Sequence, residues 1–184
     1  MKITLGVAGS IAAYKAADII NRLKEEHQIN VVMTNSATKF ITPLTLEVLS
    51  QNKVSSNVFE AEDVTVSHVE LGTKADLILV APITANLIGK MTHGLADDML
   101  STILIAADPH KVIIAPAMNT KMYENKIVQE NIKKLQNLGV KVIEPRVALL
   151  ACNEYGQGAL AKVEDIVKVV KEYHDINWFR KFLC

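Results

Sequence analysis

The segment L-L-A-C-N-E-Y-G-Q-G-A-L, residues 149–160, places a thiol in a loop that is spaced by glycines. Cys152 is one of two cysteines in the chain, and the other, Cys184, is the last residue. A thiol can donate a proton or act as a nucleophile where a substrate can reach it. Gly156 and Gly158 permit backbone conformations that let a loop close over a ligand. A lone cysteine is also often a small buried apolar residue, so this segment leaves both interpretations open.

Small polar side chains follow apolar runs in three other segments. G-V-A-G-S-I-A-A-Y-K lacks the G-x-G-x-x-G dinucleotide fingerprint, but its Gly9 and Ser10 suit an anion at a helix start. A-P-I-T-A-N and P-A-M-N-T-K-M each place an asparagine or a threonine in the same kind of position. Each feature is modest alone, because these residues are common in ordinary caps and turns. Converging with the cysteine segment, they would form a ligand site.

Apolar runs alternate with amphipathic stretches, and this alternation predicts the elements that position the loops. We expect strands at 3–7, 29–33, 76–80, 111–115 and 140–143, with a further candidate at 54–59. We expect helices at 11–26, 44–49, 67–74, 84–91, 97–106, 123–138 and 163–173. This order indicates a doubly wound α/β fold with a parallel sheet covered on both faces. Ligands of such folds bind beyond the carboxyl ends of the strands.

The helical period at 11–26 predicts that Ile11, Tyr14, Ile19 and Leu23 face the core. We find no internal repeat or linker, so we expect one domain over residues 1–173. A tail at 174–184 departs from the pattern and contains the single tryptophan. That tail is either a docking segment or a frayed end.

The composition argues against several classes of function. Lys plus Arg and Asp plus Glu each number 20, so the chain has no basic footprint for nucleic acid. No apolar run approaches the ~18 residues that span a membrane, and the first residues lack the shape of a signal peptide. Two cysteines without C-x-x-C spacing favour neither a disulfide framework nor a zinc site, so we expect no metal and a cytoplasmic location.

Six segments together carry a resemblance to a known family. In chain order they are G-V-A-G-S-I-A-A-Y-K, S-H-V-E-L, A-P-I-T-A-N, G-L-A-D-D-M-L, P-A-M-N-T-K-M and A-C-N-E-Y-G-Q-G-A-L. Over about residues 1–172 the chain resembles the flavin-containing cysteine decarboxylase family, and P-x-M-N-x-x-M is its most specific motif. The resemblance implies a flavodoxin-like, Rossmann-like three-layer α/β/α fold. It also implies FMN as the cofactor and a homo-oligomer, either a trimer or a dodecamer.

The resemblance further implies roles for individual residues. The flavin phosphate would be held by Gly9, Ser10 and Ser36, and the flavin would be contacted by Thr84, Ala85, Asn86, Ser101 and Thr102. The catalytic residues would be His68, Asn119 and Cys152. Asn119 would bind the substrate carboxylate, and Met122 would lie beside it in the same motif. Lys121 and Arg146 are candidates for contact with the substrate phosphate.

The implied reaction is the FMN-dependent decarboxylation of 4′-phospho-N-pantothenoylcysteine to 4′-phosphopantetheine in coenzyme A biosynthesis. Direct loss of CO2 would leave an unstabilised carbanion. In this family the flavin oxidises the CH2–SH group to a thioaldehyde, CO2 leaves to give an enethiol, and the enethiol is then reduced. His68 would manage the thiol proton, and Cys152 would donate the proton that completes the reduction. A separate synthetase would supply the substrate, because the chain is too short to contain one.

Other interpretations stay open. His68 could be an exposed histidine at a helix start, Asn119 and the Asp97–Asp98 pair could cap helices, and Met122 could be packing. Peptide cysteine decarboxylases stop at the enethiol and lack this cysteine, and flavin prenyltransferases lack the combination of the last two motifs. A non-catalytic partner subunit would typically carry a long acidic tail and sometimes lack an active-site residue. A flavodoxin-type electron carrier would need none of the three catalytic residues. The chain departs from the family at Asn153, where many relatives have glycine, and at Leu87, where the motif has threonine.

Overall fold

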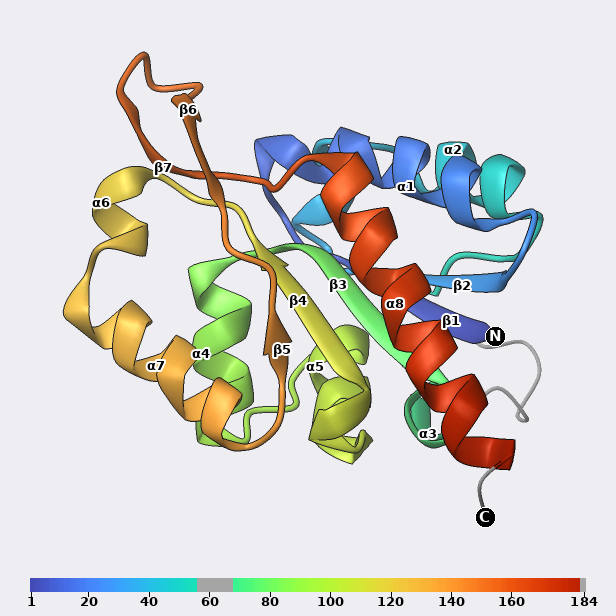
Figure 1. Ribbon diagram of the computed structural model, residues 1–184. Helices are drawn as coiled ribbons and strands as arrows, with labels where there is room; N and C mark the ends of the chain where they lie inside the picture. Colours follow the sequence, from blue (N-terminus) through green and yellow to red (C-terminus); the bar gives the residue numbers. More distant parts are fainter. Residues whose placement is uncertain (56–67, 183–184) are drawn as a thin grey trace.

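The computed structural model describes residues 1–55 and 68–182 (Figure 1). Its central sheet has five parallel strands in the order β2-β1-β3-β4-β5. These are β1 (Lys2–Val7), β2 (Gln28–Met33), β3 (Leu77–Ile83), β4 (Val112–Pro116) and β5 (Lys141–Val142). This order is that of flavodoxin-like doubly wound sheets, so the predicted fold class is confirmed.

Helices cover both faces of the sheet (Figure 1). One apolar core lies under α1 (Ala16–Leu23), α2 (Pro43–Ser50) and α8 (Val163–Phe182). The other lies under α3 (His68–Thr73), α4 (Ala85–His93), α5 (Met99–Ala106) and α7 (Lys126–Asn137). Successive strand residues serve opposite cores, since Ile113 belongs to the first and Ile114 to the second. Burial on both sides explains why the strands read as continuous apolar runs.

The first expected helix is divided and shorter. Residues 11–15 form a 3₁₀ helix, η1 (Ile11–Lys15), and α1 then ends at Leu23. The prediction that Ile11 and Tyr14 face the core is wrong, since they are 61% and 59% exposed. In a 3₁₀ helix residues i and i+3 eclipse each other. Ile11 and Tyr14 therefore share the outer side, while Ala12 and Ala13 take the buried one.

Other short elements complete the connections. They are η2 (Ala37–Lys39), η3 (Pro109–Lys111) and α6 (Thr120–Tyr123). The expected helix at 123–138 is divided into α6 and α7, because Asn125 caps α7 by accepting a hydrogen bond from the Ile127 N–H. Of the candidate strand at 54–59, Val54 is outside any strand and Ser55 forms a parallel bridge with Val32, whereas residues 56–59 lie outside the described residues.

The cysteine segment belongs to a β-hairpin rather than to an irregular loop. Strands β6 (Arg146–Leu149) and β7 (Tyr155–Ala159) pair antiparallel and project beyond the sheet (Figure 1). Helix α8 follows and runs past Tyr173 to Phe182, so it enters the expected tail. A domain boundary at residue 173 stays a prediction. Within the described residues, no helix has both the length and the apolar character needed to cross a membrane.

Candidate active site

The carboxyl ends of four parallel strands bring the predicted polar loops to one edge of the sheet. Backbone hydrogen bonds connect neighbouring loops along this edge. The pairs are Thr34 N–H to Val7 O at 3.1 Å, Ala8 N–H to Pro82 O at 3.1 Å, and Ala117 N–H to Ile83 O at 3.0 Å. The backbone of the sheet therefore fixes the loops relative to one another.

Gly9 and Ser36 meet where the loops after β1 and β2 approach each other. A Cβ atom on Gly9 would lie 2.3 Å from Ser36 Cβ, so this approach requires a glycine. Ser10 begins η1, and its Oγ accepts a hydrogen bond from the Ala12 N–H at 3.3 Å. Ser10 is half-buried and Ser36 is exposed, so both hydroxyls are within reach of a ligand. The close approach and the two hydroxyls fit a phosphate group.

Residues 84–86 follow β3, directly beside the loop after β1. Thr84 Oγ1 accepts a hydrogen bond from the Leu87 N–H at 3.4 Å and begins α4. Ala85 is half-buried and Asn86 is exposed. The Leu87 side chain is 1% exposed and packs in the core, so it has no access to a ligand. The strand order reverses between β1 and β3, which is where ligands of this fold bind.

Ser101 and Thr102 lie in the first turn of α5, where a capping network uses their hydroxyls. Asp98 Oδ1 accepts from the Ser101 N–H at 2.8 Å, and the Asp98 N–H donates to Ser101 Oγ at 3.0 Å. Thr102 Oγ1 donates to the Asp98 carbonyl at 2.8 Å. Lys90 Nζ lies 2.6 Å from Asp97 and 2.7 Å from Asp98. The G-L-A-D-D-M-L segment thus caps a helix, which is the role that the sequence analysis left open for the Asp97–Asp98 pair.

Opposing effects set the ionisation of this network. Burial would lower the pKa of Lys90, but its hydrogen bonds to Asp97 and Asp98 outweigh burial and raise it. Burial would raise the pKa of Asp98, but its bonds to Lys90 and Ser101 hold it below the ordinary value. Both groups are therefore charged at neutral pH, and the network holds the start of α5.

Asn119 connects the sheet edge to the hairpin. Its Oδ1 accepts a hydrogen bond from the Lys121 N–H at 2.8 Å, so it caps α6. Its Nδ2 donates to Cys152 Sγ at 3.1 Å and to Glu154 Oε2 at 3.3 Å. The cap fixes the orientation of the amide, because Oδ1 must face the helix. The N–H donors consequently face Cys152.

Two glycines let the hairpin dock against the loop after β4. The Met118 N–H donates to the Gly158 carbonyl at 2.9 Å. A Cβ on Gly158 would lie 2.3 Å from Met118 O, and the Gly158 φ is 155°. A Cβ on Gly156 would lie 2.4 Å from Thr120 Oγ1. From the sequence we expected these glycines to let the loop close. In the structure they also let the hairpin backbone approach Met118 and Thr120 closely.

The hairpin tip presents Cys152 as an exposed free thiol. Its Sγ–H donates to Glu154 Oε2 at 3.8 Å. Lys121 Nζ lies 3.6 Å from the other Glu154 oxygen. Asn153 has a φ of 59°, in the left-handed region that asparagine tolerates better than most residues. The exposed position contradicts the interpretation of Cys152 as a buried apolar residue.

Tyr123 anchors α6, which carries Asn119 at its start. Its hydroxyl donates to Glu144, and burial together with this carboxylate raises the pKa of Tyr123 to about 12. The phenol is therefore neutral at physiological pH and keeps its proton for the bond. Met122 on the same helix is 48% exposed, so it is not core packing.

The structure groups most of the predicted residues, and of His68 it describes the backbone alone. His68 begins α3, and its side chain lies outside the described part of the chain. Thr4 Oγ1 holds the helix by donating to the Leu71 carbonyl at 2.9 Å. Gly72 allows α3 to pack closely on α5, since a Cβ there would lie 2.9 Å from Ile103 O. The catalytic role of His68 beside Asn119 thus stays a prediction.

Two residues near the site had no role in the sequence prediction. Glu154 contacts both Asn119 and Cys152. Thr120 Oγ1 is buried and has no hydrogen-bond partner among the described residues. Glu154 could have been identified from the sequence, because its carboxylate is only two residues after Cys152. Nothing in the sequence indicated that Thr120 would pack against Gly156.

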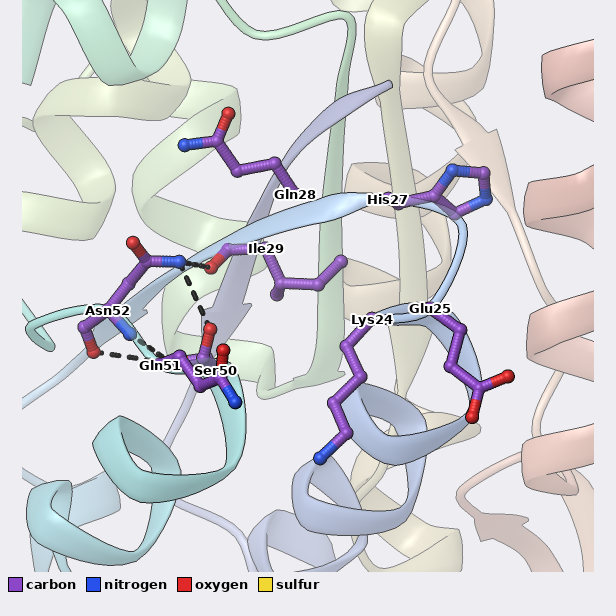
Figure 2. Close-up of a pocket in the computed structure, with 8 residues that line it drawn as sticks. All are labelled: Lys24, Glu25, His27, Gln28, Ile29, Ser50, Gln51 and Asn52. Carbon is purple, nitrogen blue, oxygen red and sulfur yellow. Dashed lines mark hydrogen bonds between the residues drawn. The ribbon is translucent and has the colours of Figure 1, made fainter.

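A hollow of about 460 Å³ lies at the opposite edge of the sheet, beside the start of β2 (Figure 2). The polar groups that line it are mainly hydrogen-bonded to nearby backbone. Asn52 Nδ2 donates to the Ile29 carbonyl at 2.9 Å and to the Ser50 carbonyl at 3.1 Å. This hollow is therefore separate from the loops described above.

Comparisons with known proteins agree with this geometry. A probable phosphopantothenoylcysteine decarboxylase from Streptococcus mutans is 49% identical over 175 residues, which cover 93% of this chain and 97% of that protein. The coenzyme A biosynthesis bifunctional protein CoaBC of Borreliella burgdorferi is 44% identical over 169 residues. That match covers 91% of this chain but only 43% of the bifunctional protein.

Solved structures give the same result. A PPC decarboxylase mutant complexed with pantothenoylaminoethenethiol superposes with a TM-score of 0.84 at 30% identity, covering 95% of this chain and 98% of that one. The FMN-dependent cysteine decarboxylase SpaF superposes with a TM-score of 0.80 at 27% identity, covering 95% and 97%. The family model described as Flavoprotein matches residues 1–174. The resemblance carried by the motifs is confirmed, and the chain belongs to the Flavoprotein family.

Proposed function

We propose that this chain is an FMN-dependent phosphopantothenoylcysteine decarboxylase of coenzyme A biosynthesis. The contact between Asn119 Nδ2 and Cys152 Sγ at 3.1 Å carries the proposal. It joins an amide suited to a carboxylate with a thiol suited to proton donation. The name of the Streptococcus mutans relative and the ligand in the solved PPC decarboxylase mutant support the choice of substrate.

The sheet edge fits a flavin. Gly9, Ser10 and Ser36 would hold its phosphate, since a Cβ would fill the approach that Gly9 keeps open. Thr84, Ala85 and Asn86 would contact the flavin from the neighbouring loop. Thr102 is a further proposed contact, and Ser101, which is 0% exposed, would act through the cap that it forms with Asp98. When bound, FMN would take electrons from the thiol-bearing carbon of the substrate and later return them.

Before CO2 is released, Asn119 would position the substrate and His68 would move one proton. His68 would accept the proton of the substrate thiol, because imidazole exchanges protons near neutral pH. The Nδ2 group of Asn119 would donate to the substrate carboxylate. A neutral donor holds the carboxylate without over-stabilising the charge that decarboxylation disperses. The cap at Lys121 keeps this donor in place, so binding requires no reorientation of the amide.

After CO2 release, Cys152 would donate a proton to carbon. Its Sγ lies 3.8 Å from Glu154 Oε2, which can accept the thiol hydrogen while no substrate carbon is in reach. Substrate bound to Asn119 would replace the Asn119–Cys152 contact and free the thiol for the reaction. Met122, exposed on α6, would cover an apolar part of the substrate. Closure of the hairpin would keep water away from the enethiol.

Assembly and supply of substrate belong to the same proposal. We expect a homo-oligomer, either a trimer or a dodecamer, in the cytoplasm. Large apolar side chains exposed around η1 and α2 support association, and these are Ile11, Tyr14, Phe40, Leu44 and Val48. We expect a separate synthetase to supply the substrate, as the bifunctional name of the longer relatives suggests.

Mass spectrometry of 4′-phospho-N-pantothenoylcysteine incubated with the FMN-loaded protein tests the proposal. Loss of CO2 alone is the expected result. Loss of CO2 together with two hydrogens would instead favour a peptide cysteine decarboxylase that stops at the enethiol. An unchanged substrate mass would contradict the decarboxylase assignment and favour a flavin-binding partner subunit.

A His68→Asn variant tests the residue whose side chain lies outside the described part. We expect a yellow, FMN-loaded protein whose rate of CO2 release falls by about 10²–10⁴-fold, the usual contribution of a proton-transfer group. A colourless variant would show that His68 supports flavin binding or folding instead.

A further inference from the structure

A second hollow of about 470 Å³ lies at the base of the hairpin, away from the Cys152 tip. It lies between the start of α1 and the start of α8. Lys15, the last residue of η1, lines one side. Arg146, the first residue of β6, and Lys162, just before α8, line the other. The hollow thus adjoins η1, the first turns of α1 and α8, and the base of the hairpin.

The positive charges that line this hollow form no ion pairs among the described residues. Asp18 and Glu164 also line the hollow, but Arg22 binds both of these carboxylates. Arg22 Nε lies 2.9 Å from Asp18 Oδ1, and Arg22 Nη2 lies 2.9 Å from Glu164 Oε1. In the described part of the chain, the three lining cations form no ion pair with a carboxylate. The hollow therefore has an excess of positive charge.

The positive charges of Lys15 and Arg146 repel each other at this hollow. Burial and then the charge of Arg146 lower the pKa of Lys15, and the charge of Glu164 opposes this. Arg146 Nε donates to the Leu160 carbonyl at 3.2 Å, which orients the guanidinium. Its remaining N–H groups can form the planar fork that binds phosphate oxygens. An anion bound here would relieve the repulsion.

The spacing between this hollow and the thiol matches a long substrate. Cys152 is six residues from Arg146, which at ~3.3 Å per residue allows a separation of at most about 20 Å. The chain from phosphorus to sulfur in the proposed substrate spans roughly 15 Å when extended, at ~1.2 Å per backbone bond. A molecule of this length can reach from the base of the hairpin to its tip.

Lys121, on α6, lies beside the tip of the hairpin. Its Nζ lies 3.6 Å from Glu154, beside Cys152, and 82% of its side chain is exposed. A phosphate at Lys121 would place the thiol end of the substrate away from Asn119. The structure therefore separates the two cations that the sequence offered for the phosphate.

We propose that Lys15 and Arg146, with Lys162 at the rim, bind the terminal phosphate of the substrate at the base of the hairpin. This rests on the proposed function. The hairpin would then hold both ends of the substrate, and the phosphate would help to bring Cys152 over the reacting carbon. A flavin phosphate offers the same chemistry, so the test must distinguish the two sources.

The test compares kcat/KM for 4′-phospho-N-pantothenoylcysteine with that for unphosphorylated N-pantothenoylcysteine. We expect Lys15→Gln with Arg146→Gln to reduce the preference for the phosphorylated substrate by about tenfold or more, mainly through KM. The turnover of the unphosphorylated substrate and the ratio of flavin to protein should stay at wild-type values. Arg146→Lys keeps the charge without the fork, and we expect it to lose part of the preference.

Lys24→Gln is the matched control, because Lys24 lines the separate hollow of similar size beside β2. It should leave the preference unchanged. A preserved preference in the double variant, or a loss of preference in Lys121→Gln instead, would overturn the proposal. Loss of flavin from the double variant would also overturn it, and would assign the hollow to the flavin phosphate. If the wild-type protein decarboxylates neither compound, the proposed function itself fails.

Discussion

Asn119 and Cys152 contact each other, but they belong to regions that are held in different ways. Asn119 follows β4, whose residues are all buried, and backbone hydrogen bonds tie its loop to the neighbouring strand. Cys152 lies at the tip of a hairpin whose strand β6 is mostly exposed. The hairpin returns to the sheet edge through Gly156 and Gly158.

This difference assigns different tasks to the two regions. A buried sheet edge can hold a binding group within the small tolerance that catalysis demands. An exposed hairpin has fewer contacts to break, so it can open for the substrate and close again. The amide proposed to orient the substrate is therefore on the rigid side, and the thiol proposed to act last is on the side that can move.

Cys152→Ser should have the largest effect, because it removes the thiol of the hairpin and keeps a side chain of similar shape. We expect CO2 release to continue while formation of the saturated thiol falls by about 10²–10⁴-fold. Mass spectrometry should then find a product that lacks two hydrogens. Cys184→Ser is the control and should behave like the wild type. A normal yield of saturated thiol from Cys152→Ser would contradict the proton-donor role.

Gly158→Ala should have the next largest effect, because it separates the two regions. The new Cβ would lie 2.3 Å from Met118 O, so the hairpin must shift away from Asn119. A displacement of about 1 Å can reduce turnover by about 10²-fold. We would measure kcat/KM together with protease cleavage within 146–159.

Gly89→Ala provides the comparison for this variant. Gly89 lies in α4, and a Cβ there would meet no atom within 4 Å. That variant should keep full activity and gain about 0.5–1 kcal/mol of stability. Wild-type activity in Gly158→Ala would imply that the docked position of the hairpin is not the reactive one.

The rigid region was largely predictable from the sequence. Parallel strands buried on both faces are continuous apolar runs, so β1, β2, β3 and β4 were placed within a few residues. The topology of such sheets then brings Gly9, Thr84 and Asn119 to one edge without further information. Asn119 also illustrates that capping and binding are compatible, because its Oδ1 and Nδ2 have separate partners.

The hairpin was less predictable. Its strands are short, carry two glycines and have no alternation of apolar residues, so the segment resembled a loop. The contact of Glu154 with Cys152 depends on a turn at Asn153, and nothing local requires that turn. The exposure of Ile11 and Tyr14 was missed because a 3₁₀ turn and an α-helical turn have similar apolar patterns.

Asp98→Ala should affect the stability of the rigid region. The variant loses the cap on Ser101 and one of the two carboxylates that bind Lys90. We expect a loss of about 1–2 kcal/mol in the free energy of unfolding, measured with urea. Asp97→Ala is the control, since the Asp97 side chain is 66% exposed and its ion pair should contribute less.

The same carboxylate predicts a pH dependence. The folded pKa of Asp98 lies below its unfolded value near 3.9, so its contribution is complete above that value. The contribution should disappear as the pH falls through the folded pKa. The difference in unfolding free energy between wild type and Asp98→Ala should therefore shrink below about pH 4. A difference that persists at acid pH would assign the effect to packing.

His27 gives the smallest effect, at the edge of the sheet opposite the site. It is 6% exposed, and its Nε2 is buried without a hydrogen-bond partner among the described residues. Burial, and then the nearby Met1 amino group and His174, lower the pKa of His27, while Glu26 opposes this. The unfolded chain therefore binds a proton below about pH 6.5 that the folded chain resists, so stability falls as the pH drops through this window.

We expect His27→Gln to lose less stability than the wild type between pH 7.5 and 5.5 in urea unfolding. His93→Gln, which changes an exposed histidine on α4, should match the wild type. If His27→Gln loses as much as the wild type, the acid sensitivity arises elsewhere, and the two edges of the sheet differ in chemistry but not in their response to protons.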